Sequence, residues 1–571
     1  MKELTFSKSK TYLNLLNYIL SMEKELILKY TLQNAIRYDG KANPGAIIGK
    51  ILKEKPELKS KIKDISKEIA NTVKEVNKLN IEEQTTKLLS LDPKLLEKKE
   101  HKKKSLPDLN IKNLVMRFEP SPSGALHIGH AYVLGLNHLL CKENNGKLIL
   151  RIGDTNPGNI VEEAYKLIEE DAKWLTNNSI EKVYTQSDRL EIYYKYAKKI
   201  LEMEKAYICT CNPEDFRSKI NNKIACHCRN LPKEEQLKRW DKMHNEYKPG
   251  QAVMRIKTDI NVNNPALRDW PAFRISEKNH IKQKNKYKVW PLMNFAVAID
   301  DHDMGITATI RAKEHRDNEK RQKYLYDYFS WTPPKNLYVG RINFSDMKVS
   351  KTYVQNLLKL KRRTGWDDIR LPFLPALRKR GYQPEALLKY AEEVGLTETD
   401  KTTSKEEFFK SINSFNRDII DKKADRSFII LEPYKKLEIK KAPKKDVQLD
   451  LYPSIRLGGR NFYTDGEFYF EEKFKKDKVY RLMHLYNIKN REFLSEEVDD
   501  RLSAQMIHWL PANMKNINVE ILMENNKITK GLGEESLNKV KEGEIIQAER
   551  FAFLRVLEKT KNKIKFIYLH R

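Results

Sequence analysis

VMRFEPSPSGALHIGHA, residues 115–131, is the stretch that decides the fold of this protein. It begins as a short apolar strand, breaks at two prolines and a glycine, and enters a helix with apolar periodicity over residues 127–143. The first backbone N–H groups of a helix have no partner within the helix, so this unit predicts an anion-binding site. His127 and His130 share a face near that terminus, and Gly129 between them lets a planar ring or a ribose approach the backbone. The pattern favours a nucleoside triphosphate over the alternative that the two histidines are caps or metal ligands.

A second element, MKVSKT at residues 347–352, is a polar loop with two lysines. It follows an apolar segment, residues 337–344, that is predicted to be one strand. Such a loop alone is usually a solvated turn. Paired with the histidine face, however, Lys348, Ser350 and Lys351 can bind phosphate groups by charge and hydrogen bonding. The sequence has no glycine-rich Walker loop, so we expect the helix dipole, histidine and lysine to hold ATP.

These two elements resemble the HIGH and KMSKS motifs of class I aminoacyl-tRNA synthetases. The surrounding sequence resembles the glutamyl/glutaminyl group of that class in its archaeal form. The resemblance implies an ATP-dependent glutamate–tRNA ligase, which forms glutamyl-adenylate and transfers the glutamyl group to the 3′ end of tRNA(Glu). It implies that ATP, with Mg²⁺, is bound by His127, Gly129, His130, Lys348, Ser350 and Lys351. His127, His130 and Lys351 are expected to be catalytic.

The resemblance implies that Arg117 and Ser121 hold the amino acid, and Arg311 and Asp154 are further candidates to bind it. Arg311 ends a predicted strand, residues 307–311, where its two-pronged guanidinium can pair with the side-chain carboxylate of glutamate. The resemblance implies the same preference, because glutamyl enzymes carry arginine here and glutaminyl ones do not. Two positions depart from the relatives: Gly153 stands where a carboxylate commonly faces the substrate ammonium, and Met293 stands where a tyrosine is common. Three alternatives stay open: Asp154, one residue along, turns toward the ammonium, a water molecule bridges the gap, or the enzyme is slow. We expect a weak apparent affinity for glutamate.

The order of predicted elements favours a multidomain chain with α/β and all-β parts. Alternating strands and helices predict a parallel sheet, and short strands between glycine turns after residue 428 predict barrels. The expected domains are an N-terminal helical extension (1–105), a class I Rossmann-type catalytic domain in two halves (106–205 and 288–352), an acceptor-binding insertion (206–287), a helical stem-contact domain (353–430) and a β-barrel anticodon-binding domain (431–571). Residues 12–20 are expected to be helical, residues 97–104 to be a charged linker, and residues 295–302 to be a buried strand.

Aromatic side chains in two of these domains are candidates to stack on unpaired tRNA bases. They are Trp270 and Phe273 in the insertion, and Phe462, Tyr463 and Phe470 in the barrel. For Trp270 and Phe273 a place in the core is an equal alternative.

Four of the five cysteines form two Cys-x-Cys pairs separated by fourteen residues. Cys209, Cys211, Cys226 and Cys228 could therefore give four thiolates to one tetrahedral zinc. The single residue within each pair is tighter than the usual two to four, so idle thiols and disulfides stay open as alternatives. His227 could replace one cysteine as a ligand.

The charge of the chain points to a polyanionic partner. A formal net charge of +29 over 571 residues favours nucleic acid. The resemblance implies that this partner is tRNA(Glu) and, in the archaeal form, also tRNA(Gln). The sequence has no apolar run long enough to cross a membrane and no signal-peptide pattern at its start, so a cytoplasmic protein is expected, most simply a monomer.

Three other functions stay open: a glutaminyl-tRNA synthetase, a nucleotidyltransferase of the same superfamily, and a catalytically weak or silent tRNA-binding relative.

Overall fold

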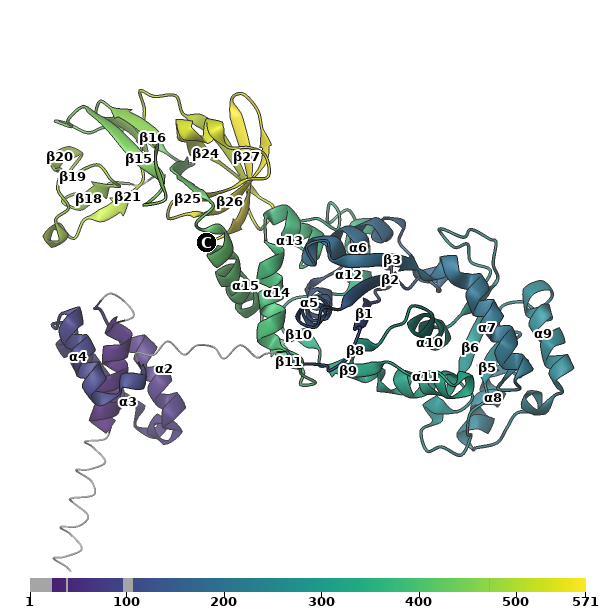
Figure 1. Cartoon of the computed structure of the whole chain (residues 1–571). Coiled ribbons are helices and arrows are strands. Elements are labelled where there is room, and N and C mark those ends of the chain that lie inside the picture. Colours follow the sequence, from purple (N-terminus) through teal and green to yellow (C-terminus); the bar gives the residue numbers. More distant parts are fainter. Residues whose placement is uncertain (1–22, 37–39, 96–105, 472) are drawn as a thin grey trace, which may run out of the picture. The chain divides into compact units, whose positions relative to one another are not determined.

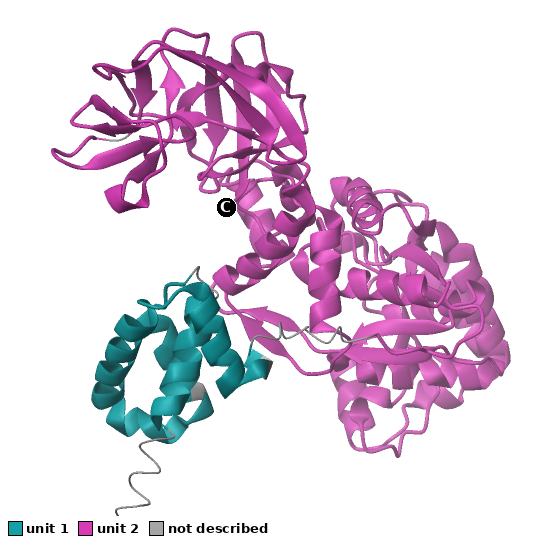
Figure 2. Ribbon diagram, turned by 60° about the vertical axis from the view of Figure 1, so that its left-hand side comes forward, with its two compact units in different colours: residues 1–103 teal, residues 104–571 magenta. Residues whose placement is uncertain are grey.

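The computed structural model describes residues 23–36, 40–95, 106–471 and 473–571. The chain divides into two compact units, residues 1–103 and residues 104–571 (Figure 2). Each unit has its own apolar core, and each is described here by itself.

The first unit is helical in its described part. A helix covers residues 23–36, and it is followed by α2 (Pro44–Glu54), α3 (Ile62–Val76) and α4 (Ile81–Leu91). Asn80 caps α4 and forms a reciprocal pair of hydrogen bonds with Glu83, which satisfies two of the free N–H groups at the helix start. The predicted helix at 12–20 and the predicted linker at 97–104 lie outside the described residues.

The second unit is built on a five-stranded parallel sheet in the order β3-β2-β1-β8-β9 (Figure 1). The strands are Ile180–Thr185 (β3), Lys147–Ile152 (β2), Val115–Phe118 (β1), Ala308–Ala312 (β8) and Lys335–Val339 (β9). The helices that connect or follow them are α5 (Ile128–Glu143), α6 (Glu162–Leu175), α7 (Leu190–Glu202), α10 (Met293–Asp303) and α11 (Arg316–Phe329). The strand–loop–helix prediction for residues 114–143 is confirmed. In such a sheet ligands bind beyond the carboxyl ends of the strands, where Arg117 of β1 and Arg311 of β8 stand.

Two sequence predictions in this region are wrong. The expected strand at 295–302 is part of helix α10, whose residues from Phe295 to Asp301 are all buried. A helix buried on every side shows no 3.6-residue periodicity, so its apolar run cannot be told from a buried strand. The expected single strand at 337–344 is split at Gly340 into β9 and β10 (Ile342–Phe344), and β10 pairs with β11 (Lys401–Thr403) instead of joining the main sheet. A Cβ at Gly340 would lie 2.4 Å from the carbonyl oxygen of Thr399, so the bend requires glycine.

An insertion with its own antiparallel sheet interrupts the parallel sheet. Its strands are β4 (Ala206–Cys209), β5 (Val253–Ile256), β6 (Pro271–Ile275) and β7 (Val289–Pro291), and its helices are α8 (Pro213–Asn221) and α9 (Lys233–Asn245). Trp270 and Phe273 are buried in the core that this sheet shares with α7, α10 and α11. Neither ring is therefore free to stack on a base in this structure.

After the parallel sheet come four helices, α12 (Lys351–Lys359), α13 (Leu374–Arg380), α14 (Pro384–Val394) and α15 (Lys405–Ile420). Helices α13 to α15 lie between this sheet and the C-terminal strands (Figure 1). The loop that opens the site packs closely against this region. Gly124 has a φ of +140°, and a Cβ there would lie 2.3 Å from the Trp366 ring. Glycine at 124 thus lets the ring contact the backbone of the loop.

The C-terminal region is all-β and contains a nearly closed barrel. Seven strands follow the order β12-β25-β26-β27-β23-β24-β13. They are Asp425–Ser427 (β12), Ile545–Ala548 (β25), Ala552–Lys559 (β26), Lys563–His570 (β27), Ile517–Leu522 (β23), Ile528–Gly533 (β24) and Ile429–Leu431 (β13). The two end strands, β12 and β13, are separated in sequence by Phe428 alone, which brings the ends of the sheet together.

Smaller sheets complete this region. They contain β14 (Lys435–Glu438), β15 (Lys445–Tyr452), β16 (Arg456–Thr464), β17 (Glu467–Phe470), β18 (Val479–Leu482), β19 (Asn487–Lys489), β20 (Glu492–Ser495), β21 (Gln505–Ile507) and β22 (Leu510–Pro511). Of the three rings expected to meet bases, Phe462 and Phe470 are buried, whereas Tyr463 is 42% exposed. Only Tyr463 among them is available for stacking.

Within the described residues, no helix combines the length and the apolar character needed to cross a lipid bilayer.

Candidate functional site

The start of α5 places two histidines where the sequence predicted them. His127 is the N-cap: its Nδ1 accepts a hydrogen bond from the Gly129 N–H at 3.0 Å, and the Nδ1 of His130 accepts from the His127 N–H at 3.2 Å. Each histidine therefore caps the helix start through its Nδ1 and keeps its Nε2 for another partner. Since Nδ1 is an acceptor in both rings, a neutral imidazole here carries its proton on Nε2. Both rings line one cavity, so they can offer two N–H donors to an anion.

Burial keeps these rings neutral. It lowers the pKa of His127 to about 3, with a further contribution from the charge of Lys351. Burial also lowers the pKa of His130 well below its ordinary value, and the neighbouring His127 and Lys351 add to the effect. At neutral pH both side chains therefore act as hydrogen-bond donors rather than as proton donors.

The cavity has a volume of about 960 Å³ and lies at the carboxyl ends of β1, β2 and β8. Of the residues predicted to bind ATP or amino acid, it is lined by Arg117, Ser121, His127, Gly129, His130 and Arg311. Gly153 and Met293, the two positions at which the resemblance implies other residues, also line it. Its volume is of the size that binds small ligands, and its wall combines apolar surface with many polar and charged groups.

A buried charge network fixes the two arginines of the cavity. The Asp301 carboxylate lies 3.4 Å from Nε of Arg117 and 3.5 Å from Nη2 of Arg311, and it accepts a 2.7 Å hydrogen bond from Arg151. Burial alone would raise the pKa of Asp301, but the charges of Arg151, Arg117 and Arg311 outweigh it and hold the pKa below its usual range. Asp301 is thus an anion shared by three guanidinium groups.

Arg311 remains short of negative charge in this network. Its Nη1 donates to Gln322 Oε1 at 2.7 Å and its Nε donates to Thr309 Oγ1 at 3.1 Å. Burial, and after it the charge of Arg117, lowers the pKa of Arg311 below its ordinary value. Two neighbouring arginines with one shared carboxylate form a site suited to an anionic ligand.

The lysine loop meets the other side of the histidine loop. Ser350 caps α12, and Nζ of Lys351 donates to the Ser121 carbonyl at 3.0 Å. Burial lowers the pKa of Lys351 to about 8. Lys348 lies 5.0 Å from the centre of the Tyr353 ring. Of this loop only Val349 lines the cavity, so Lys348, Ser350 and Lys351 stand beside the cavity rather than in its wall.

The Asp154 carboxylate lies behind the cavity wall, where neighbouring side chains and a backbone N–H bind it. Its carboxylate is buried and accepts hydrogen bonds from Tyr165 Oη at 2.7 Å and from the Ser187 N–H and hydroxyl at 2.8 and 2.7 Å. It does not line the cavity. In this structure the Asp154 oxygens are bound behind the wall, so the role expected of Asp154 would require its side chain to leave Tyr165 and Ser187.

Three cavity or network residues were not predicted as functional: Glu119, Gln186 and Asp301. Glu119 lies within residues 115–131 and directly follows β1. Its place at the carboxyl end of a strand could have indicated a functional residue. Asp301 lies within residues 295–302, and the buried strand predicted there gave no reason to expect its side chain beside the cavity. Nothing in the sequence singles out Gln186.

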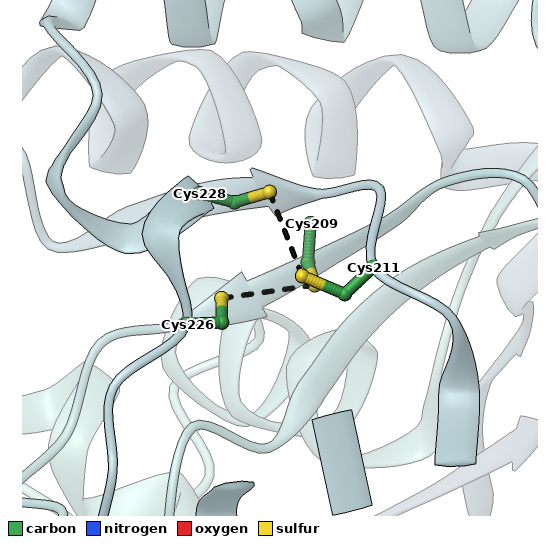
Figure 3. A group of neighbouring side chains, drawn as sticks. All are labelled: Cys209, Cys211, Cys226 and Cys228. Carbon is green, nitrogen blue, oxygen red and sulfur yellow. Dashed lines mark hydrogen bonds between the residues drawn. The ribbon is translucent and has the colours of Figure 1, made fainter. Parts of the chain in front are cut away.

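The four predicted cysteines come together in the insertion (Figure 3). Their sulfur atoms all lie within 4.8 Å of one another, with 3.9 Å between Cys209 and Cys226 and 3.8 Å between Cys211 and Cys228. A regular tetrahedron with Zn–S bonds near 2.3 Å has sulfur atoms about 3.8 Å apart, so the donor set fits zinc. The structure has all five cysteines free, which sets the disulfide alternative aside.

His227 lies beside this cluster without belonging to the four. Its Nε2 is 3.4 Å from Cys228 Sγ and its Nδ1 is 3.9 Å from Cys211 Sγ. Arg239 also donates to Cys228 Sγ at 3.4 Å, and such a cation favours the thiolate form that binds metal.

Comparison with known proteins shows the family of the chain. The family model described as tRNA synthetases class I (E and Q), catalytic domain, matches residues 113–422. A glutamate–tRNA ligase of Methanocaldococcus jannaschii is 40% identical over 566 residues, and one of Pyrococcus furiosus is 41% identical over 579 residues; each comparison covers 96% of this chain and 100% of the relative. A solved glutamate tRNA ligase of Elizabethkingia meningosepticum is 22% identical, with a TM-score of 0.39, over 54% of this chain and 70% of that one. The chain therefore belongs to the glutamate–tRNA ligases of the archaeal type, within the class I tRNA synthetases.

Proposed function

We propose that this chain activates glutamate with ATP and transfers it to the 3′ end of tRNA(Glu). The observation that carries the proposal is the shared cavity: two neutral histidines at a helix N-terminus face the same space as the arginine pair Arg117 and Arg311. The first group suits phosphate oxygens and the second suits the side-chain carboxylate of glutamate. Glutamine has no charge for Arg311 to neutralise, so the same pair disfavours a glutaminyl enzyme.

In the first step the α-carboxylate of glutamate attacks the α-phosphate of ATP and pyrophosphate leaves. Negative charge is then spread over phosphate oxygens, and preorganised donors stabilise it best. Nε2–H of His127 and of His130 would donate to these oxygens, together with the free N–H groups of α5. The Lys351 ammonium would leave the Ser121 carbonyl and bind the departing pyrophosphate, with Lys348 and Ser350 beside it.

In the second step the terminal ribose hydroxyl of tRNA attacks the carbonyl carbon of the adenylate, and AMP leaves. Mg²⁺ that accompanies ATP would neutralise phosphate charge, with phosphate oxygens and water as its main ligands. The wall carboxylates Glu119 and Glu314 each face an arginine, which favours ligands from the nucleotide over ligands from the protein.

The other domains are proposed to hold the tRNA. The insertion would bind the acceptor end, helices α12 to α15 the stem, and the C-terminal strands the anticodon, with the exposed Tyr463 as the candidate for base stacking. Cys209, Cys211, Cys226 and Cys228 would hold one structural Zn²⁺ that braces the insertion. We further propose that the enzyme is a cytoplasmic monomer and that it also accepts tRNA(Gln).

A charging assay with total tRNA tests the whole proposal. We expect ATP-dependent attachment of glutamate and not of glutamine, and no attachment to tRNA whose terminal diol has been destroyed by periodate. Charging of an isolated tRNA(Gln) transcript with glutamate tests the broader tRNA use. A protein that binds tRNA but attaches no amino acid would instead be a silent relative.

A further inference from the structure

A small recess in the cavity wall lies over Gly153, the residue directly after β2. The N–H of Gly153 donates to the Pro120 carbonyl at 3.0 Å, which ties the end of β2 to the loop after β1. A Cβ built on Gly153 would lie 3.5 Å from Gln186 Oε1 and 3.6 Å from Glu119 Oε1. Two oxygen acceptors from separate segments thus converge on the space that a side chain at 153 would fill.

Both acceptors have unused capacity. Nε2 of Gln186 donates to Asp300 Oδ2 at 2.9 Å, which fixes the amide so that its Oε1 faces the recess. Oε2 of Glu119 accepts from Arg151 Nη2 at 2.6 Å and lies 3.4 Å from Arg117 Nε. Within the described part of the chain, Glu119 Oε1 and Gln186 Oε1 accept no hydrogen bond. Glu119, Gln186 and Gly153 all line the cavity.

The chemistry of the recess is opposite to that of its surroundings. The arginines of the wall attract anions, whereas the recess presents one carboxylate oxygen and one amide oxygen at a single point. A group that carries positive charge and several N–H donors satisfies both. A primary ammonium is the smallest such group, and the missing side chain at Gly153 leaves the room for it.

We propose that Glu119 and Gln186 bind the α-ammonium group of the amino-acid substrate in this recess. This inference rests on the proposed function and specifies how the site selects an amino acid over a plain dicarboxylate. The resemblance implies a carboxylate at position 153, and in this chain the carboxylate is supplied from position 119, on the adjacent strand end. β1 and β2 are paired, with Phe118 opposite Leu150, so the exchange moves the charge only to the neighbouring strand. On this account Gly153 does not weaken the affinity for glutamate.

Glutarate tests the recess because it is glutamate without the ammonium. The measurement is tRNA-dependent pyrophosphate exchange, from which the KM for glutamate and the inhibition constant of glutarate are obtained. We expect the wild-type protein to prefer glutamate strongly. In Glu119→Gln the inhibition constant of glutarate divided by the KM for glutamate should fall by roughly tenfold or more, because a charge-assisted hydrogen bond to the ammonium is lost. The KM for ATP should change little.

Gly153→Ala is the second variant, and it removes no charge. Its Cβ would be in ordinary van der Waals contact with both oxygens and its backbone is not in the left-handed region, so the protein should fold. The methyl group would occupy the recess, and the KM for glutamate should rise by roughly tenfold while glutarate binding stays the same. The exchange variant Glu119→Ala with Gly153→Glu should recover selectivity that Glu119→Ala alone has lost.

Glu314→Gln is the matched control, since Glu314 is the other carboxylate of the wall and its charge faces Arg341. It should leave the inhibition constant of glutarate divided by the KM for glutamate unchanged. An active wild-type protein whose ratio is unaffected by both Glu119→Gln and Gly153→Ala would overturn the inference but not the proposed function. A wild-type protein with no glutamate-dependent exchange would overturn the proposed function itself.

Discussion

Arg311→Ala separates recognition of the glutamate side chain from the stability of the site. In the proposed complex the guanidinium of Arg311 pairs with the side-chain carboxylate inside a buried network. Removal of one partner of such a pair leaves a buried charge uncompensated and costs about 3 to 5 kcal/mol. We therefore expect kcat/KM for glutamate to fall by roughly 100-fold or more. The KM for ATP should change little.

The same structure predicts that the variant folds. Asp301 keeps Arg151 at 2.7 Å and Arg117 at 3.4 Å, so its charge stays compensated. Gln322 loses one hydrogen bond, worth about 1 kcal/mol. Against that loss, the variant removes a cation whose pKa is already lowered by burial and by the charge of Arg117. The midpoint of thermal unfolding should therefore move by no more than a few degrees.

Pyrophosphate exchange in the presence of tRNA, with glutamate titrated, measures the effect. Arg311→Lys keeps the charge but not the two-pronged geometry and should fall between the wild type and Arg311→Ala. Gln322→Ala keeps the Arg311 guanidinium but removes the hydrogen bonds of Gln322 with Arg311 and with Asn294, and it should cost a few-fold. An Arg311→Ala protein within threefold of wild-type kcat/KM, or a wild-type protein that activates glutamine better than glutamate, would refute the reasoning.

Four further predictions address the rest of the molecule. Lys351→Ala should abolish pyrophosphate exchange while tRNA affinity in a filter-binding assay stays nearly the same; unchanged exchange would contradict the assigned role. In the wild type, kcat/KM for ATP should fall as the pH rises through about 8, because that is where Lys351 loses the ammonium charge that binds pyrophosphate; a flat profile from pH 7 to 9.5 would argue against it. Elemental analysis should find about one zinc per chain, lost in the double variant Cys226→Ser/Cys228→Ser, with tRNA charging reduced more than ATP binding; a native protein without metal would exclude the site. Deletion of residues 1–105 should weaken tRNA binding and reduce its salt dependence without changing ATP binding; equal tRNA affinity would assign this unit to another task.

Prediction from sequence succeeded where a local sequence pattern was compatible with a single structure. The turn chemistry after β1 and the periodicity of residues 127–143 gave the strand–loop–helix unit, and the spacing of the cysteines gave the four-thiol cluster. It failed where burial removes the pattern, as in α10, and where a long-range contact bends the chain, as at Gly340. The position of Asp154 also depends on long-range contacts: its neighbour Gly153 faces the cavity, but Tyr165 and Ser187 hold the Asp154 carboxylate behind the wall. No property of the dipeptide itself reveals that outcome.

The link between β12 and β13 has a consequence for the order in which the C-terminal region folds. These two strands flank Phe428 and are the first strands of the C-terminal region to be synthesised. Their partners, β25 and β24, are about 100 residues further along the chain. During synthesis both strands therefore leave the ribosome with unpaired edges, and they stay so until the chain through Ala548 has emerged. Exposed edges of this kind recruit other strands. The barrel should thus be the last part of the enzyme to mature, and nascent chains that stop before β23 should be those most prone to aggregate.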